Sequence, residues 1–132
     1  MSTIVEKIEK LPNMISFTNA TADQIKNAEA ELNLRFADEY RDYLAAFGAV
    51  VADGTELTGI ANSEHRKVTA VTKREWELNP QVPHSMYVVE NVGIDGIIIW
   101  QDASGTIYQS LPKKDPEKIF EDLADYLSSK EK

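Results

Sequence analysis

Two aspartates, Asp95 and Asp102, stand on either side of the most apolar run of the chain, residues 97–101. Carboxylates held at the two ends of one strand are side chains of the right type for acid–base catalysis. Each of them also lies in a glycine-containing segment, and aspartate and glycine favour tight turns. Turn formation alone accounts for both positions, so the sequence predicts no catalytic role for this pair.

Other residue types that carry enzymatic or metal chemistry are sparse. The sequence contains no cysteine, which removes thiol nucleophiles, thiolate ligands and disulfides. Its two histidines, His65 and His84, fall in segments predicted as loops and have none of the spacings typical of a zinc site. The glycines form no phosphate-binding pattern. We therefore expect a protein that is not an enzyme and that uses no metal and no cofactor.

Acidic side chains are the remaining candidates for function. Five lie on predicted strand ends, turns or the wet face of the predicted sheet: Asp53, Glu56, Glu90, Asp95 and Asp102. Trp100 is the candidate aromatic anchor beside them, because tryptophan is enriched among the residues that dominate interface energies. These six residues form the predicted partner-binding set. The alternative is that the acids are solvated turn residues and that Trp100, like Trp76 and Tyr108, belongs to the core.

The charge balance indicates which partner such a surface would take. The chain has 22 acidic and 14 basic residues, a net charge of −8. This argues against nucleic acid as a partner, because binding phosphates needs a basic surface. A basic protein fits, since complementary charge speeds association and excludes wrong partners. Further acids lie on the outer faces of two predicted helices: Asp38, Glu39 and Asp42, and Glu117, Glu121, Asp122 and Asp125.

Regular elements must position these side chains, and the clearest are two helices within residues 21–48. Thr21 and Gln24 form a capping box that starts the first helix, and the second helix begins near Ala37. Apolar residues recur every three to four positions, at Ile25, Ala28 and Leu32 and then at Tyr40, Tyr43, Leu44 and Phe47. Gly48 ends the second helix, as glycine commonly does just past a helix end.

Turn signals and alternation predict the other elements. We expect a helix over 3–10 capped by Ser2, an extended connector packed on the body over 13–19, a hairpin around Asp53-Gly54, and strands over 86–92, 97–101 and 106–111. Thr72 and Glu75 form a second possible capping box, which predicts a short helix over 73–78 that buries Trp76 and Leu78. A last helix opens at Asp115-Pro116, with its inner stripe at Ile119, Phe120, Leu123 and Leu127.

Together these elements predict one α+β domain over residues 1–132. Its antiparallel or mixed sheet has about four to six strands, flanked by an N-terminal helix pair and a C-terminal helix. No segment approaches the roughly 20 apolar residues that a membrane-spanning helix needs. A signal peptide is not evident either. We therefore expect a cytoplasmic protein without membrane contact, and the sequence leaves its oligomeric state open.

Two stretches of the chain carry motifs of a known family. The first is Glu-Leu-x-Leu-x-Phe followed by Glu-Tyr-x-x-Tyr-Leu-x-x-Phe-Gly, within residues 31–48. The second is Asp-Gly, a strand, and Asp-x-x-Gly-x-Ile-Tyr, within residues 95–108. Over residues 20–127 the chain thereby resembles the SUKH superfamily, which includes yeast cell-wall-synthesis regulators and many bacterial immunity proteins. Phe36-Ala37 and Gly48-Ala49-Val50 replace the usual Leu-Pro and glycine-rich segments.

The resemblance implies a binding protein. Immunity proteins are antitoxins that bind a cognate secreted toxin, often a nuclease, and block it inside the bacterial cell that produces it. For this chain the resemblance implies a toxin protein as the partner, and the acidic balance suits a basic one. The alternative is a regulatory or scaffolding domain without a toxin partner, which is the role of the yeast relatives.

Overall fold

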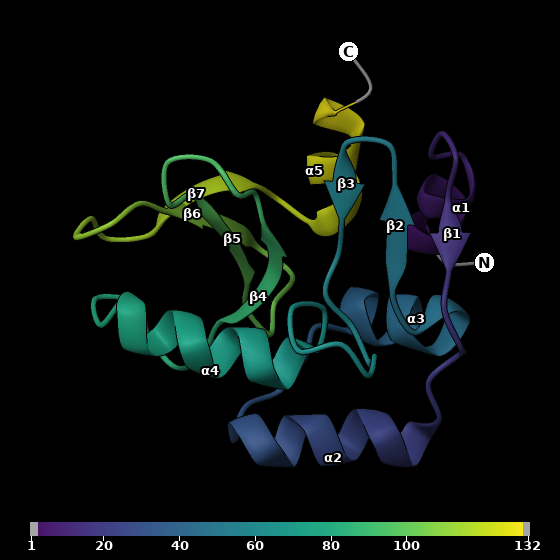
Figure 1. Ribbon diagram of the computed structural model, residues 1–132, viewed down its shortest axis with the longest axis horizontal. Helices are drawn as coiled ribbons and strands as arrows, with labels where there is room; N and C mark the ends of the chain where they lie inside the picture. The colour runs from purple at the N-terminus through teal and green to yellow at the C-terminus, as the bar shows by residue number, and fades with distance from the viewer. Residues whose placement is uncertain (1–2, 131–132) are drawn as a thin grey trace.

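The computed structural model describes residues 3–130, with helices and strands interspersed along the chain (Figure 1). The helices are α1 (Thr3–Glu9), α2 (Ala22–Leu32), α3 (Asp38–Phe47), α4 (Val68–Leu78) and α5 (Leu123–Ser129). The strands are β1 (Ile15–Ser16), β2 (Val50–Ala52), β3 (Thr55–Glu56), β4 (Tyr87–Asn91), β5 (Ile98–Gln101), β6 (Ile107–Ser110) and β7 (Glu117–Phe120). The predicted cap Ser2 lies outside the described residues.

The strands form two antiparallel sheets, ordered β1-β2-β3 and β4-β5-β6-β7. Their edges meet where the Thr58 N–H donates to the Val89 carbonyl at 3.0 Å and the Thr58 hydroxyl donates to the Val88 carbonyl at 2.8 Å. Figure 1 shows the sheets side by side, with α2, α3 and α4 along their lower side. The α+β class and the antiparallel strands are as the sequence predicts, and the strands are divided between two joined sheets.

The helix pair α2 and α3 matches the prediction closely. Thr21 and Gln24 form the capping box, with the Gln24 N–H donating to the Thr21 hydroxyl at 3.1 Å and the Thr21 N–H donating to the Gln24 carbonyl oxygen at 2.9 Å. The predicted inward residues of both helices are all buried. Asn33 ends α2 with a φ of +53°, in the left-handed region that asparagine tolerates better than most residues.

Two buried tyrosines of α3, Tyr40 and Tyr43, attach the helix to the joint between the sheets, and a third, Tyr87 of β4, accepts a 3.0 Å hydrogen bond from the Ala37 N–H at the start of α3. The Tyr40 hydroxyl lies 2.8 Å from the Thr58 hydroxyl, and the Tyr43 hydroxyl donates to the Thr58 carbonyl at 2.6 Å. The Tyr87 hydroxyl donates to the Gln101 side-chain oxygen at 2.8 Å. Burial raises the pKa of all three hydroxyls, so they remain protonated donors. Each buried hydroxyl has a partner, which removes the penalty for burying it.

Two glycines allow three backbone segments to touch beside the end of α3. Gly48 has a φ of +73°, and a Cβ at this position would lie 2.0 Å from the Thr18 carbonyl oxygen. A Cβ at Gly59 would lie 2.0 Å from the Gly48 carbonyl oxygen. Any side chain at either position would therefore force the backbone apart. The contact holds the chain around β1 against the end of α3.

The predicted short helix over residues 73–78 is wrong in its start and in one buried residue. Helix α4 begins at Val68, and Thr72 lies inside it, where its hydroxyl accepts a 3.0 Å hydrogen bond from the Val88 N–H. Leu78 is 66% exposed, whereas Glu75 is buried. The polar side chain of Thr72 is therefore used in tertiary contact with β4, a role that local capping rules do not distinguish from an N-cap.

The predicted last helix also starts too early. Residues 117–120 form strand β7, which pairs with β6, so Ile119 and Phe120 belong to the sheet. Helix α5 is capped by Asp122, whose carboxylate accepts a 2.8 Å hydrogen bond from the Asp125 N–H. The four-stranded sheet thus contains β7 in addition to the three strands predicted over residues 86–111.

Helix α1 packs against both α3 and α5, so the first and last helices of the chain are neighbours. The connector that follows α1 was expected to pack on the body, yet Ile15 is 64% exposed and Phe17 is 37% exposed. No helix among residues 3–130 is both long enough and apolar enough to cross a membrane.

Candidate partner-binding surface

Carboxylates gather around a depression of about 370 Å³ at the N-terminal end of α3. Helices α1, α3 and α5 and the turn between β5 and β6 contribute to its walls. Its lining residues are Thr3, Ile4, Ala37, Asp38, Glu39, Asp42, Ala103, Ser104, Gly105 and Asp122. Four of these described residues are acidic and none is basic. The depression can therefore receive a positively charged side chain of another molecule.

Glu39 holds the walls of this depression together. Its carboxylate accepts hydrogen bonds from the N–H groups of Leu123 at 2.7 Å and Ala124 at 3.0 Å, and from the Gln101 amide at 2.8 Å. Burial raises the pKa of Glu39, while these hydrogen bonds oppose the rise. Glu39 therefore connects α3 to the start of α5 and to β5, and its bonding capacity is largely used inside the protein.

The other three carboxylates are more available to a partner. Asp38 is exposed and has only a 3.3 Å contact with Arg41, a residue that also pairs with Glu29 at 2.9 Å. Within residues 3–130, the exposed Asp42 has no ion pair or hydrogen-bond partner on its carboxylate. Asp122 uses one oxygen to cap α5. Such carboxylates are solvated in the free protein and can exchange water for a cationic partner.

Asp102 lies at this end of the molecule, in the turn that supplies one wall of the depression. Its carboxylate accepts hydrogen bonds from the Ser104 N–H and hydroxyl, the Thr106 N–H and the Tyr108 hydroxyl, at 2.6–3.2 Å. The Asp102 carboxylate therefore organises its own turn, as the turn-based interpretation of the sequence holds. It still adds negative charge beside the depression.

Three of the predicted contact acids lie away from Asp102. Asp95 precedes β5 whereas Asp102 follows it, and Asp53 and Glu56 belong to the β2–β3 hairpin of the other sheet, where the Glu56 N–H bonds to Glu90 of β4. Asp95 is exposed in a turn with a φ of +53°. Asp53, between β2 and β3, accepts a 2.6 Å hydrogen bond from the Asn13 amide. Glu56 lies 3.4 Å from the Arg66 guanidinium. The six predicted residues therefore do not form one surface.

Glu90 and Trp100 were expected at the surface, and the structure contradicts this. Glu90 is 4% exposed, and its carboxylate accepts hydrogen bonds from the Tyr126 hydroxyl at 2.5 Å and the Glu56 N–H at 3.0 Å, with the Lys130 ammonium at 2.8 Å. Trp100 is fully buried, and its indole N–H donates to the Ser110 hydroxyl at 2.8 Å. Both side chains belong to the interior, as the core alternative predicted for Trp100.

The histidines lie apart from the depression. His65 is exposed, with its Nδ1 2.6 Å from the Ser63 hydroxyl and its Nε2 3.7 Å from Glu56. His84 stacks on Trp76 with ring centroids 4.1 Å apart. Within residues 3–130, no three or more His, Asp or Glu side chains are grouped to hold a metal ion.

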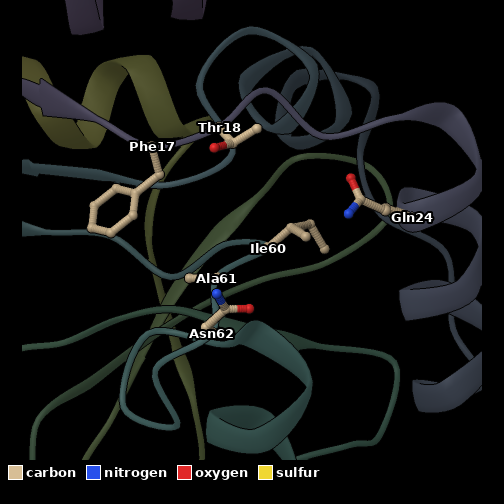
Figure 2. A pocket seen from close by; sticks show the side chains of 6 residues that line it. All are labelled: Phe17, Thr18, Gln24, Ile60, Ala61 and Asn62. Atoms are coloured by element: carbon tan, nitrogen blue, oxygen red, sulfur yellow. The ribbon is translucent and has the colours of Figure 1, made fainter.

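A second, smaller depression of about 280 Å³ lies at the opposite end of α3, near the Gly48 contact. Figure 2 shows its lining side chains: Phe17, Thr18, Gln24, Ile60, Ala61 and Asn62. None of these six residues is charged, and Phe17 projects from its rim. The two depressions therefore differ in chemistry, one acidic and one neutral.

Sequence reasoning placed Asp38, Glu39, Asp42 and Asp122 on outer helix faces but did not include them in the predicted partner-binding set. The acidic depression joins residues from four parts of the chain, and only the fold brings them together. Their types and spacing along the chain contain no signal for this arrangement.

The chain also matches a known family along nearly its whole length. A family model described as SUKH_5, SMI1-KNR4 cell-wall, matches residues 1–130. No curated protein matches the chain. The family match includes both stretches whose motifs resemble the SUKH superfamily, and it confirms that resemblance. This chain therefore belongs to the SUKH_5 family, SMI1-KNR4 cell-wall.

Proposed function

We propose that the protein is an immunity protein, an antitoxin that binds and neutralises a cognate secreted toxin in the cytoplasm of the bacterium that produces it. Membership of the SUKH family supports a role in protein binding. The observation that carries the proposal furthest is the acidic depression, with four carboxylates and no basic residue among its described lining. The toxin that fits this surface is a basic protein, for which a nuclease is the leading class.

The physical argument rests on where a nuclease carries its charge. An enzyme that binds nucleic-acid phosphates needs a cluster of lysine and arginine side chains. An inhibitor with net charge −8 is attracted to that cluster before contact, which raises the association rate. Neutralising the toxin in this way requires binding alone and no catalytic residue.

Asp38 and Asp42 are the best placed contact residues, because both are exposed and Asp42 has no partner within residues 3–130. Asp53, Glu56 and Asp95, which lie away from Asp102, remain the alternative contact set. Exposed charge pairs contribute about 0.2–1 kcal/mol each. Neutralising two contact carboxylates should therefore weaken the complex by roughly 2- to 30-fold, most of it through slower association.

The test is capture of the toxin encoded beside this gene by the tagged full-length protein, followed by kinetics over a salt series. Two double variants are compared: Asp38→Asn with Asp42→Asn, and Asp53→Asn with Asp95→Asn. Each removes two negative charges, so they are matched in net charge. We expect the first pair alone to slow association and to reduce its salt dependence.

A larger loss from the second pair would move the contact to the β2–β3 and β4–β5 turns. Equal small losses of association rate in both double variants would mean that the charges act only through long-range attraction and that neither set contacts the toxin. If the neighbouring toxin is not bound and growth of cells expressing it is not rescued, the immunity proposal is rejected.

A second candidate function is a regulatory or scaffolding domain without a toxin partner. The description of the matched family, SMI1-KNR4 cell-wall, favours it, because the name refers to the cell-wall branch of these proteins. Recovery of several unrelated partners and no toxin from the same capture experiment would support this alternative.

A further inference from the structure

Strand β1 is an uncharged, open edge in a strongly acidic protein. Residues 11–22 contain no charged side chain, although the chain has 36 acidic and basic residues in all and a net charge of −8. Strand β1 forms one border of the three-stranded sheet, and Figure 1 shows it at the outer side of the molecule. Natural proteins usually protect such an edge by keeping it very short or with charged residues, a proline or a bulge; here the strand has two residues and Pro12 stands three residues before it. Here both residues of the strand are exposed.

The direction of the peptide groups shows which side of β1 is free. Ile15 pairs with Val51, and the Phe17 N–H donates to the Ala49 carbonyl at 3.0 Å. Successive peptide groups of a strand point to opposite sides, so those of Ser16 point away from β2. Outside the β1–β2 ladder, no main-chain hydrogen bond within residues 3–130 uses the Ser16 N–H or carbonyl, and the ladder itself leaves both pointing away from β2. Ser16 therefore offers one donor and one acceptor to a further strand.

We propose that β1 pairs antiparallel with β1 of a second copy of this chain, about a two-fold axis at Ser16. In this register Ser16 faces Ser16 of the second copy, and the two residues exchange a pair of main-chain hydrogen bonds. Ile15 of each copy then faces Phe17 of the other copy. These are the two exposed apolar side chains of this edge, at 64% and 37% exposure. Aromatic and β-branched residues make favourable cross-strand pairs.

This self-complementarity is the reason to choose a second copy over another partner. One register about one axis covers both apolar side chains and both free Ser16 groups. It also brings the Asp53 end of one β1 toward the Arg66 end of the other, where Arg66 lies 5.6 Å from the Phe17 ring and already pairs with Glu56 of its own chain at 3.4 Å. Residues 11–22 carry no charge, so two copies can approach through β1. Contact through other surfaces of chains with a net charge of −8 would bring acidic side chains together, and their repulsion would oppose association.

The dimer leaves the acidic depression free. Phe17 contacts the C-terminal end of α3, where its N–H also donates to Phe47. The depression lies at the N-terminal end of α3. The two surfaces are separated by the ten residues of α3, a distance of about 15 Å. A dimer joined through β1 would therefore carry two separate acidic depressions, and the inference does not depend on the proposed function.

The first test is sedimentation of the full chain over a concentration series. The mass should rise from that of one chain toward that of two. Ile15→Glu and Phe17→Glu each place a carboxylate in the pairing face and should raise the dissociation constant at least about tenfold. The matched control is Ile94→Glu, which changes a residue that is 60% exposed in the β4–β5 turn and should leave the dimer intact.

The second test uses the absence of cysteine in the sequence. Directly paired residues in an antiparallel ladder have Cα atoms about 5.5 Å apart, within the range of a disulfide. Ser16→Cys should therefore oxidise to a covalent dimer, and much faster than the control Ser104→Cys in the exposed β5–β6 turn.

A single-chain mass at every concentration, with equal oxidation of the two cysteine variants, overturns the proposal. So does a dimer that Ile15→Glu, Phe17→Glu and Ile94→Glu all leave intact, because the interface then lies elsewhere. If the chain stays monomeric and a bound toxin protects Ser16→Cys from alkylation, the edge receives the toxin and the dimer is rejected.

Discussion

Removing the ammonium group of Lys130 should destabilise the fold more than an ordinary surface substitution does. Lys130 lies 2.8 Å from the Glu90 carboxylate and 5.1 Å from the centre of the Tyr126 ring, and it donates to the Gly54 carbonyl at 3.0 Å. The side chain of Glu90 is 5% exposed and that of Lys130 is 24% exposed. Lys130→Met keeps the aliphatic contacts and leaves a buried carboxylate without its cation.

The magnitude follows from burial. Removing one member of a fully buried ion pair costs about 3–5 kcal/mol. Lys130 is partly hydrated, and Glu90 retains hydrogen bonds from Tyr126 and from the Glu56 N–H, so we expect about 2–3 kcal/mol. Burial, with the nearby Glu90 carboxylate, raises the pKa of Tyr126, which therefore keeps donating its proton to Glu90 at neutral pH.

The assay is urea unfolding at neutral pH, followed by tryptophan fluorescence, because the buried Trp100 becomes exposed to water on unfolding. Lys130→Met, Glu90→Gln and the double variant complete a double-mutant cycle. Glu90→Gln should cost about 1–2 kcal/mol, since its amide oxygen still accepts from Tyr126. The double variant should cost at least about 1 kcal/mol less than the sum, because no uncompensated charge remains.

Additive losses, within about 0.5 kcal/mol, would refute this reasoning. They would show that Lys130 and Glu90 stabilise the protein independently, and that solvent already screens the pair. A loss below about 0.5 kcal/mol for Lys130→Met alone would lead to the same conclusion, because that is the range of ordinary surface substitutions.

Three further predictions concern side chains inside the fold. Ser110→Ala should cost about 1–3 kcal/mol in urea unfolding, because it leaves the buried indole N–H of Trp100 without an acceptor. Burial raises the pKa of Glu39 above its usual 4.5. The protonated carboxyl of Glu39 therefore stabilises the folded state most below pH 4.5, and this stabilisation is lost as the pH rises through the raised pKa. Urea unfolding at several pH values should show the stability of the protein relative to Glu39→Gln falling as the pH increases; a constant difference would contradict the burial argument. Gly48→Ala should cost more than 3 kcal/mol or prevent folding, as judged by circular dichroism, whereas Gly54→Ala, with similar φ and open space, should cost about 1–2 kcal/mol.

The parts of the fold that local sequence signals determine were predictable. Thr21 and Gln24 are three residues apart, and the capping box that this spacing favours is present. The inward residues of α3 follow the helical period, and all are buried because the period alone defines one face. The strands β4, β5 and β6 were also predicted in order, since turn residues separate them in the sequence.

The errors arose where two local signals compete and tertiary contact decides between them. Asp115-Pro116 and Asp122 are both plausible helix starts, and Ile119, Phe120, Leu123 and Leu127 keep a helical spacing. Pairing of residues 117–120 with β6 selects Asp122 as the cap. Nothing within this segment encodes that choice, because its partner strand lies elsewhere in the chain.

The candidate site was the least predictable part. Carboxylates on turns and strands look alike in sequence, whether they end up exposed like Asp95 in a turn or buried like Glu90 in β4. The distinction depends on Lys130 and Tyr126, which lie about 40 residues after Glu90 and supply its partners. Asp38 and Asp122 likewise meet only because α3 and α5 are adjacent in the fold.

The packing of α1 against α5 has a consequence for synthesis of the chain on the ribosome. The first helix cannot bury its apolar face completely until the last helix has left the exit tunnel. The buried residues Ile4 and Ile8 therefore stay partly uncovered until residues 123–129 have emerged. Complete folding of residues 3–130 therefore waits until nearly all of these residues have emerged.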